Sequence, residues 1–191
     1  TASSRFPHDA PSRECLVRVG ETLRPGSIAT YRMWMTESNL TFWAQRERNA
    51  NDGISMIQTA EGGLNEVSSI LTRLRELSIQ SASDTVGDPE RAFTNLEYQN
   101  LKQEIERISQ VTDFNGKKLL DGSGDKFDFQ IGIHNNDFQD RIKFDAAMTN
   151  SGLESLAIGE LDVSNKEGAQ TSLANLDAAI EKVSGQRAAL G

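Results

Sequence analysis

The chain has 191 residues, of which 37% are hydrophobic and 25% charged, so it can bury one real core and its composition argues against wholesale disorder. The formal net charge of −8 argues against nucleic acid or an anionic membrane as the main partner, and no apolar run approaches the roughly 18–20 residues of a membrane span. Residues 1–48 carry seven Arg and five acidic side chains, whereas residues 49–191 carry 13 basic and 23 acidic ones. The one cysteine, Cys15, cannot form an internal disulfide.

The first 36 residues show no sustained period of 3.6 or 2, only scattered Pro, Gly and Arg. Leu16, Val17 and Val19 would suit a short strand or a helical turn. We therefore treat residues 1–36 as an unrecognised segment, either disordered or aberrant, and expect the first helix to begin near Glu37.

The first predicted helix, about 37–80, has a clear heptad pattern. Its apolar positions are Ile57, Leu64 and Leu71, then Ala60, Val67 and Leu74, with Met56, Ile70 and Leu77 on the flank. Such a face is wider than a two-stranded seam and can contact more than one neighbour. Gly62 and Gly63 would each weaken the helix by about 1 kcal/mol relative to Ala, so we expect a close backbone approach or a bend there.

A second helix is predicted at about 88–111, where Asp88 can cap the start and Pro89 suits the first helical position. Its buried stripe consists of Tyr98, Leu101, Ile105 and Ile108. Because only a short loop separates it from the first helix, the two should lie antiparallel.

A β-hairpin region is predicted at about 113–163. Phe127, Phe129, Ile131 and Ile133 alternate with polar residues as in a half-buried strand, and Ile142 and Phe144 alternate in a returning strand. We further expect a helical turn at 153–156 and a short strand at 161–163.

The last predicted helix spans about 168–190. Its apolar positions step by three and four through Leu173, Leu176, Ile180, Val183 and Leu190, with Arg187 at the one polar position of the seam. Six Ala in this segment allow close approach of another helix. The pattern is still running at Gly191, so we expect the sequence to be truncated.

Catalytic and metal sites are not indicated. His8 and His134 are the only histidines, and neither has a Cys or a second His at ligand spacing. Asp121–Asp125 resembles a cation loop but lacks the alternating oxygen ligands and distal Glu of an EF-hand, so it is read as a tight turn. We therefore predict no enzyme activity, no metal and no cofactor.

Several sequence blocks, in order along the chain, carry a resemblance to a known family. They are RNANDGIS at 48–55, QTAEGGL at 58–64, LTRLRELS at 71–78, TDFNGKKLL at 112–120 and FQIG at 129–132. From about Glu37 to Gly191 the chain resembles the inner filament domain of bacterial flagellin. The resemblance implies a mainly α fold, a long antiparallel rod of three long helices with a β-hairpin region at one end. It also implies a structural subunit that self-assembles through rod packing for motility.

The resemblance also implies partners and a contact surface. These partners are other flagellin subunits, the flagellar export chaperone and cap, and the flagellin-sensing Toll-like receptor of animals, with neither nucleic acid nor membrane involved. The implied location is the extracellular filament, reached without a cleaved signal peptide. The residues that match the receptor-contact or subunit-packing surface are Leu71, Arg73, Arg75, Leu77 and Glu104. Periodicity alone places Leu71 and Leu77 on the apolar face and leaves Arg73 and Glu104 as plain surface charges, so both interpretations stay open.

The sequence departs from the family at its ends. Residues 1–36 lack the amphipathic terminal helix of flagellins, and its C-terminal partner is missing, so we expect partial folding and poor polymerisation. The unfamiliar composition of residues 1–36 resembles that of a frameshifted or wrongly predicted start, or of a divergent extension. Two alternative functions remain: a hook–filament junction protein, which shares the rod architecture, and a non-filament helical binding module whose wide apolar face accepts a partner helix.

Overall fold

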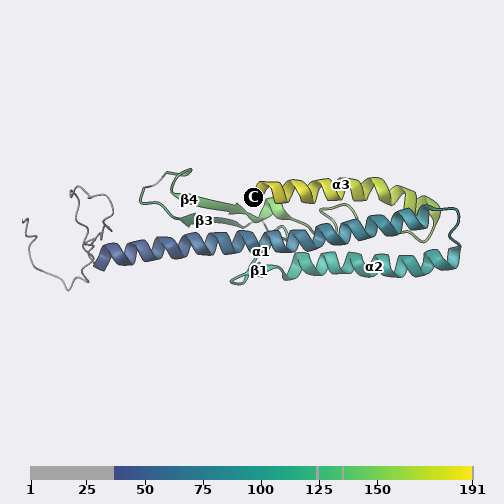
Figure 1. Cartoon of the computed structure of the whole chain (residues 1–191), viewed down its shortest axis with the longest axis horizontal. Helices are drawn as coiled ribbons and strands as arrows, with labels where there is room; N and C mark the ends of the chain where they lie inside the picture. Colours follow the sequence, from purple (N-terminus) through teal and green to yellow (C-terminus); the bar gives the residue numbers. More distant parts are fainter. Residues whose placement is uncertain (1–36, 124, 135, 191) are drawn as a thin grey trace, which may run out of the picture.

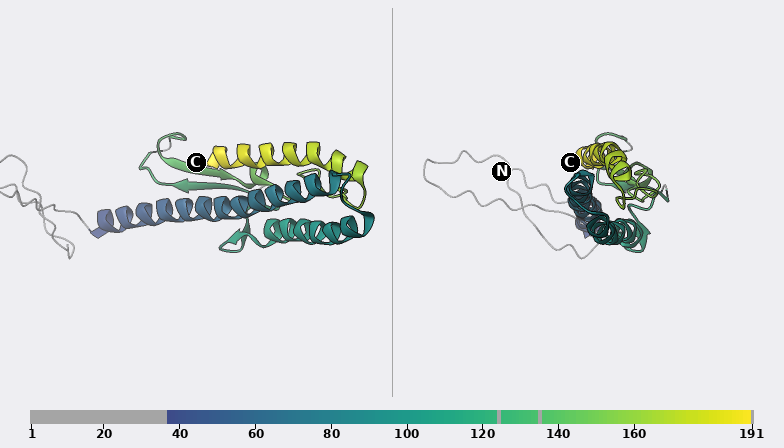
Figure 2. Two further views of the ribbon diagram at one scale, coloured as in Figure 1. Left: turned by 45° about the vertical axis from the view of Figure 1, so that its right-hand side comes forward. Right: turned by 90° about the vertical axis from the view of Figure 1, so that its right-hand side faces the viewer.

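The computed structural model describes residues 37–123, 125–134 and 136–190 as an elongated, mainly helical rod (Figure 1). Three long helices run along it: α1 (Glu37–Ala82), α2 (Asp88–Val111) and α3 (Lys166–Leu190). Each of their ends lies within two residues of the predicted limit, and α1 lies between α2 and α3 (Figures 1 and 2). The predicted mainly α fold with three antiparallel helices is confirmed. The expectations for residues 1–36 lie outside the described residues.

The heptad face of α1 forms the centre of the core. Its fully or nearly fully buried residues are Met56, Ala60, Leu64, Val67, Leu71, Leu74 and Leu77, while Ile57 and Ile70 pack at the edge. This is the stripe that the sequence predicts, and its width lets α1 contact α2 on one side and α3 on the other.

The seam of α3 is rotated from the predicted one. Its buried residues are Ala169, Ser172, Leu176, Ala179, Val183 and Gln186, whereas Leu173, Ile180 and Arg187 are only partly buried. Small side chains at the centre of the seam let α3 approach α1 closely, and the larger residues flank the contact. Gln186 takes the polar seam position predicted for Arg187, and its Nε2 donates a 2.9 Å hydrogen bond to Asn150 O.

The turn between α1 and α2 is organised by Arg91, which is buried. Its guanidinium donates hydrogen bonds of 2.9 Å to Ser81 O, Ser83 O and Asp88 Oδ1. Arg91 thereby satisfies carbonyl groups at the end of α1. Asp88, predicted as the cap of α2, is instead its first residue, and Gly87 occupies the cap position without a side-chain hydrogen bond.

Two small antiparallel sheets follow α2. Strands β1 (Asp113–Phe114) and β2 (Lys117–Lys118) form a tight hairpin. Its turn residues Asn115 and Gly116 have φ angles of 51° and 76°, the left-handed backbone that an Asn-Gly hairpin turn favours.

The second sheet pairs β3 (Lys126–Gln130) with β4 (Arg141–Asp145), placing Phe127 opposite Phe144 and Phe129 opposite Ile142. The predicted hairpin is confirmed, although β3 ends at Gln130 and Ile133 lies beyond it, 60% exposed. A short 3₁₀ helix, η1 (Ala146–Thr149), follows β4.

The segment after η1 is irregular, and the strand predicted at 161–163 is wrong. The segment does not pair with another strand; instead, three side chains one or two turns apart on α2 bind its backbone. Asn95 Oδ1 accepts from Val163 N at 3.2 Å, and Gln99 Nε2 donates to Leu161 O at 3.2 Å. Lys102 Nζ donates to Leu161 O at 2.8 Å and to Gly159 O at 2.5 Å. These bonds satisfy backbone groups that a strand neighbour would otherwise pair.

Candidate protein-interaction surface

The five residues predicted as a contact surface fall into two groups. Leu71 and Leu77 are buried in the core, at 0% and 2% exposure, as the periodicity interpretation has it. The side chains of Arg73, Arg75 and Glu104 lie on the surface. In this structure only these three of the five are accessible to a partner.

Arg73 links α1 to α2 across the outer surface. Its Nη2 and Nε contact Glu97 Oε1 at 2.8 and 3.0 Å, and its Nη1 contacts Glu76 Oε2 at 3.0 Å. The hydrogen bond to Glu97, followed by that to Glu76, raises the pKa of Arg73. These bonds orient the guanidinium between the two carboxylates, while about half of the side chain stays exposed.

Arg75 points to the opposite flank of α1. Its Nε donates a 2.6 Å hydrogen bond to Asp177 Oδ1 on α3, and this bond together with the charge of Asp177 raises the pKa of Arg75. Because Arg73 and Arg75 pair with different helices, they do not form one continuous patch.

Glu104 pairs within α2. It accepts a 2.7 Å hydrogen bond at Oε2 from Arg107 Nε, and this bond lowers the pKa of Glu104. It makes no ion pair with Arg73, whose acidic partner on α2 is Glu97. Sequence reasoning missed Glu97, although it lies seven residues before Glu104 on the same helical face, closer to the turn that brings α2 alongside Arg73.

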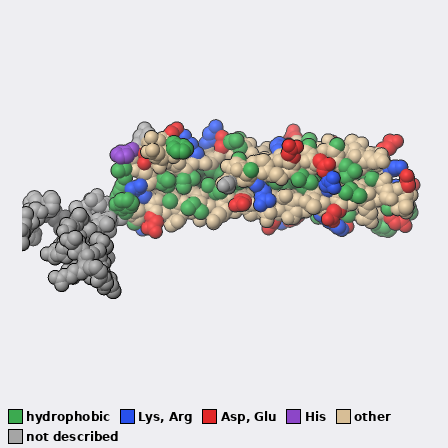
Figure 3. Space-filling model, turned by 45° about the horizontal axis from the view of Figure 1, so that its top comes forward, with side chains coloured by type: hydrophobic (Ala, Val, Ile, Leu, Met, Phe, Trp, Pro, Cys, Tyr) green, Lys and Arg blue, Asp and Glu red, His purple; other side chains and the backbone are tan. Residues whose placement is uncertain are grey.

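Apolar side chains stand out among the charges of this surface. On α2, Phe93 is 73% exposed and Leu96 is 64% exposed, one turn apart on the same face. On the face of the rod that Figure 3 shows, acidic and basic side chains are interspersed along its length. An exposed aromatic and aliphatic pair within a charged surface is typical of a protein contact rather than of a catalytic site.

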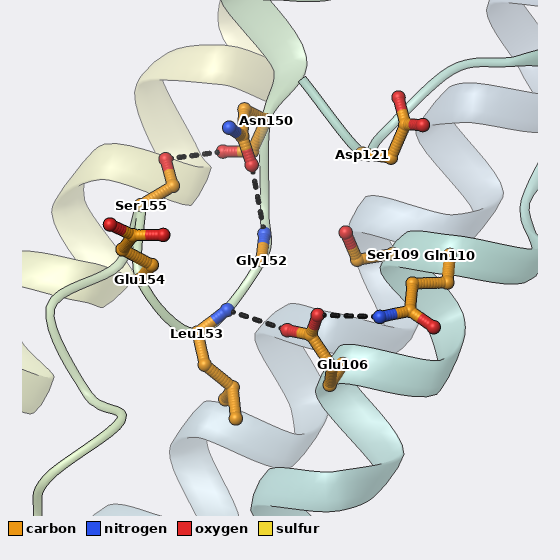
Figure 4. A pocket seen from close by; sticks show the side chains of 9 residues that line it. All are labelled: Glu106, Ser109, Gln110, Asp121, Asn150, Gly152, Leu153, Glu154 and Ser155. Atoms are coloured by element: carbon orange, nitrogen blue, oxygen red, sulfur yellow. Dashed lines mark hydrogen bonds between the residues drawn. The ribbon is translucent and has the colours of Figure 1, made fainter. Parts of the chain in front are cut away.

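A polar hollow of about 510 Å³ lies between α2 and the loop at 150–155 (Figure 4). Its polar groups bond to one another: the carboxylate of Glu106 accepts from Leu153 N at 3.0 Å and from Gln110 Nε2 at 2.7 Å. Asn150 Oδ1 accepts from Gly152 N at 3.0 Å. The bond from Leu153 N to Glu106 joins the loop to α2, and no nucleophile and base are paired among the residues that line the hollow.

Two further classes of site have no candidate in the described part of the chain. Within residues 37–123, 125–134 and 136–190, no three His, Cys, Asp or Glu side chains are grouped so that they could hold a metal ion. None of the helices formed by these residues is long and apolar enough to span a bilayer.

Comparisons with known proteins agree on one family. Residues 29–125 match the family model described as the bacterial flagellin N-terminal helical region. A flagellin of Halalkalibacterium halodurans is 40% identical over 147 residues, which is 77% of this chain and 53% of that flagellin. The chain thus spans about half the length of this curated relative.

Solved structures show the same likeness. The crystal structure of Bacillus cereus flagellin superposes with a TM-score of 0.64 at 30% identity, covering 75% of this chain and 81% of that one. A structure described as a flagellar hook-associated protein from Vibrio parahaemolyticus reaches 0.63 at 18% identity, covering 81% of each chain, which shows a shared fold alone. The family model covers half of the chain, and its helical rod is that of a solved flagellin. The chain therefore belongs to the bacterial flagellin family, whose members are structural proteins and not enzymes.

Proposed function

We propose that the chain is a structural subunit of a bacterial flagellar filament, acting outside the cell by packing its helical rod against other copies. The observation that carries the proposal is the match to flagellin across α1, α2 and the tight β1–β2 hairpin, which include the heptad face of α1 at the centre of the core. A rod with one unbroken core transmits force along its length because interiors are close-packed and compress little.

The outer face of α2 supports the proposal. Phe93 and Leu96 would be covered by a neighbouring subunit, which removes apolar area from water. The buried core holds α2 and α3 against α1, and the ion pairs of Arg73 and Arg75 orient their side chains, so the surface that meets a neighbour is pre-ordered. Assembly would then lose little side-chain conformational entropy.

The proposal is tested by incubating the purified chain with short flagellin filament seeds, pelleting the seeds and measuring the bound chain. We expect binding that saturates, with particles at the seed ends in negative-stain images. A Phe93→Ser/Leu96→Ser variant should bind far less. The matched control is Met148→Ser, which removes an apolar side chain of similar exposure, 66%, from η1.

Equal binding by both variants would argue against α2 as the contact face, and no binding by the unmodified chain would argue against the subunit function. Elongation of seeds by the chain alone tests the expectation of poor polymerisation separately. Circular dichroism of each variant shows whether the helical rod has been kept.

Further partners are proposed for the accessible charged residues. A flagellin-sensing Toll-like receptor would meet the monomer on the α1–α2 face, where Arg73 and Glu104 are accessible, with Arg75 on the other flank of α1. The export chaperone and the cap would bind before and during assembly. The exposure of these charged side chains supports this assignment. Pull-down by the receptor ectodomain tests it: Arg73→Ala should weaken capture, whereas Lys117→Ala on the β1–β2 hairpin should not.

The two other candidates are distinguished by the seed experiment. A hook–filament junction protein would bind seeds at one end and stop there, whereas a filament subunit would be buried as further subunits add. A helical binding module that is not part of the filament would bind neither end. The family match favours the filament subunit over both.

A further inference from the structure

The two ends of the β3–β4 hairpin are held in different ways. At its base, Phe144 and Ala146 are buried in the core, and Thr149 Oγ1 donates a 2.6 Å hydrogen bond to Leu119 O. The far end lies alongside the N-terminal part of α1, beyond the C-terminus of α3 (Figures 1 and 2). The base therefore belongs to the three-helix body, whereas the far end rests on one helix.

Two side chains of α1, here called the tip clamp, reach the far end. Arg46 Nε donates a hydrogen bond to Ile131 O, and Asn49 Nδ2 donates one of 2.9 Å to Gln130 O. The guanidinium of Arg46 lies 4.6 Å from the ring of Trp43 and 5.6 Å from that of Phe42. These rings are 55% and 46% exposed, so the clamp is oriented at the surface and not by the core.

One apolar layer lies between the clamp and the hairpin base. A Cβ at Gly53 would lie 3.2 Å from the ring of Phe129 and 3.6 Å from Ile142 Cδ1, so these two side chains rest on the helix backbone. Phe129 and Ile142 face each other across the ladder. The apolar contact of the far end with α1 therefore centres on a single cross-strand pair.

We propose that the far half of the ladder, Asp128–Gln130 with Arg141–Lys143, separates from α1 as a local unit while the helical body stays folded, and that the tip clamp sets how often it does so. A two-stranded sheet is marginal on its own, and a region with few buried apolar contacts opens at lower free energy than the core. Opening breaks the two clamp bonds and uncovers one apolar pair, but leaves Phe144, Ala146 and Thr149 in place.

The proposal predicts selective hydrogen exchange in the full chain. Exchange measured by mass spectrometry on peptides covering β3 and β4 should be faster than on peptides from the middle of α2 and α3. Arg46→Met, which keeps an unbranched apolar stem, should accelerate the hairpin peptides by roughly tenfold or more through the loss of a charged hydrogen bond. The helix peptides should not change. Asn49→Ala should act in the same direction with a smaller effect.

Arg73→Met is the matched control, because it removes an Arg of the same helix that bonds to α2 and not to the hairpin. It should leave hairpin exchange as it is. Equal acceleration of hairpin and helix peptides by Arg46→Met would overturn the proposal, since the hairpin would then open only with the whole rod. Unchanged hairpin exchange in both Arg46→Met and Asn49→Ala would overturn the role of the clamp.

Discussion

Gly63 of α1 and Leu120, which follows the β1–β2 hairpin, are in direct contact: a Cβ at Gly63 would lie 2.7 Å from Leu120 Cδ1. Thr112 Oγ1 would lie 3.0 Å from the same position, whereas the space next to neighbouring Gly62 is empty to 4 Å. The sequence predicted a close approach or a bend at this pair. The helix continues through both residues, so Gly63 serves the close approach.

We therefore expect opposite effects from two adjacent substitutions. Gly62→Ala should stabilise the chain by up to about 1 kcal/mol, because Ala restricts the unfolded backbone and favours the helix. Gly63→Ala should destabilise it, because overpacking against buried Leu120 costs about 1–3 kcal/mol and outweighs the same helical gain. Urea unfolding followed by circular dichroism measures both. Stabilisation by Gly63→Ala would show that Leu120 moves aside freely.

Arg91→Met should be strongly destabilising. The substitution keeps the length of the stem but removes three hydrogen bonds and leaves Ser81 O and Ser83 O without this donor near the end of α1. A buried group left without a partner, here Ser81 O, costs about 1–3 kcal/mol, whereas Ser83 O keeps a 3.3 Å hydrogen bond from Val86 N. With the loss of the other two hydrogen bonds of Arg91, we expect a total of about 2–4 kcal/mol. The control is Arg107→Met. The exposed side chain of Arg107 bonds to Glu104 on the same helix, so this substitution should leave the unfolding midpoint close to that of the unmodified chain.

The heptad period predicted α1 well: Leu64 and Leu71 are seven residues apart, as are Val67 and Leu74, and all four side chains are buried. The same reasoning missed Lys102, which lies on the buried face of α2 because its ammonium group bonds to carbonyl groups of a loop 57 residues away. It also missed Glu97, since nothing local indicates which acid of α2 will face Arg73. Where a polar side chain lies depends on partners that are distant in the sequence, and the pattern of apolar residues does not identify those partners.

The cross-helix ion pairs should depend on salt. The pairs Arg73–Glu97 and Arg75–Asp177 are exposed, so their coupling in a double-mutant cycle should be small at physiological ionic strength and fall further in concentrated salt. Substituting both partners of each pair by Ala, singly and together, measures this coupling by urea unfolding. Coupling that persists in concentrated salt would mean that water is excluded from the pairs.

Asp162 should stabilise the chain in a pH-dependent way. Burial opposes its charge, but hydrogen bonds from Ser164 and Asn95, together with the charge of Lys102, outweigh burial and lower the pKa of Asp162. A carboxyl whose pKa is lower in the folded state stabilises above its unfolded pKa of about 3.9, and this contribution is lost as pH falls through the folded value.

Asp162→Asn should therefore reduce the free energy of unfolding by about 1–2 kcal/mol at pH 7. The NH₂ group of the new amide would face the NH₂ group of Asn95, and two donors cannot form a hydrogen bond. The difference from the unmodified chain should shrink below about pH 4. Urea titrations at pH 7 and in acid measure it. A difference that stays constant down to low pH would mean that the carboxylate charge plays no part.

Lys102 makes the opposite contribution at alkaline pH. Burial lowers the pKa of Lys102 and outweighs the opposing charges of Glu160 and Asp162. Between the folded pKa and the usual value of about 10.4, the unfolded chain binds more protons than the folded one, so stability rises with pH across this window. The neutral amine still has two hydrogens for the carbonyl groups of Gly159 and Leu161, so its bonds survive deprotonation.

The Lys102→Met variant lacks both the titrating amine and these hydrogen bonds. It should be less stable than the unmodified chain at pH 7, and the gap should widen towards pH 10, because only the unmodified chain is relieved of a buried charge. Paired urea titrations at the two pH values cancel all other titrating groups, and a gap that narrows would show that the charged ammonium stabilises the loop.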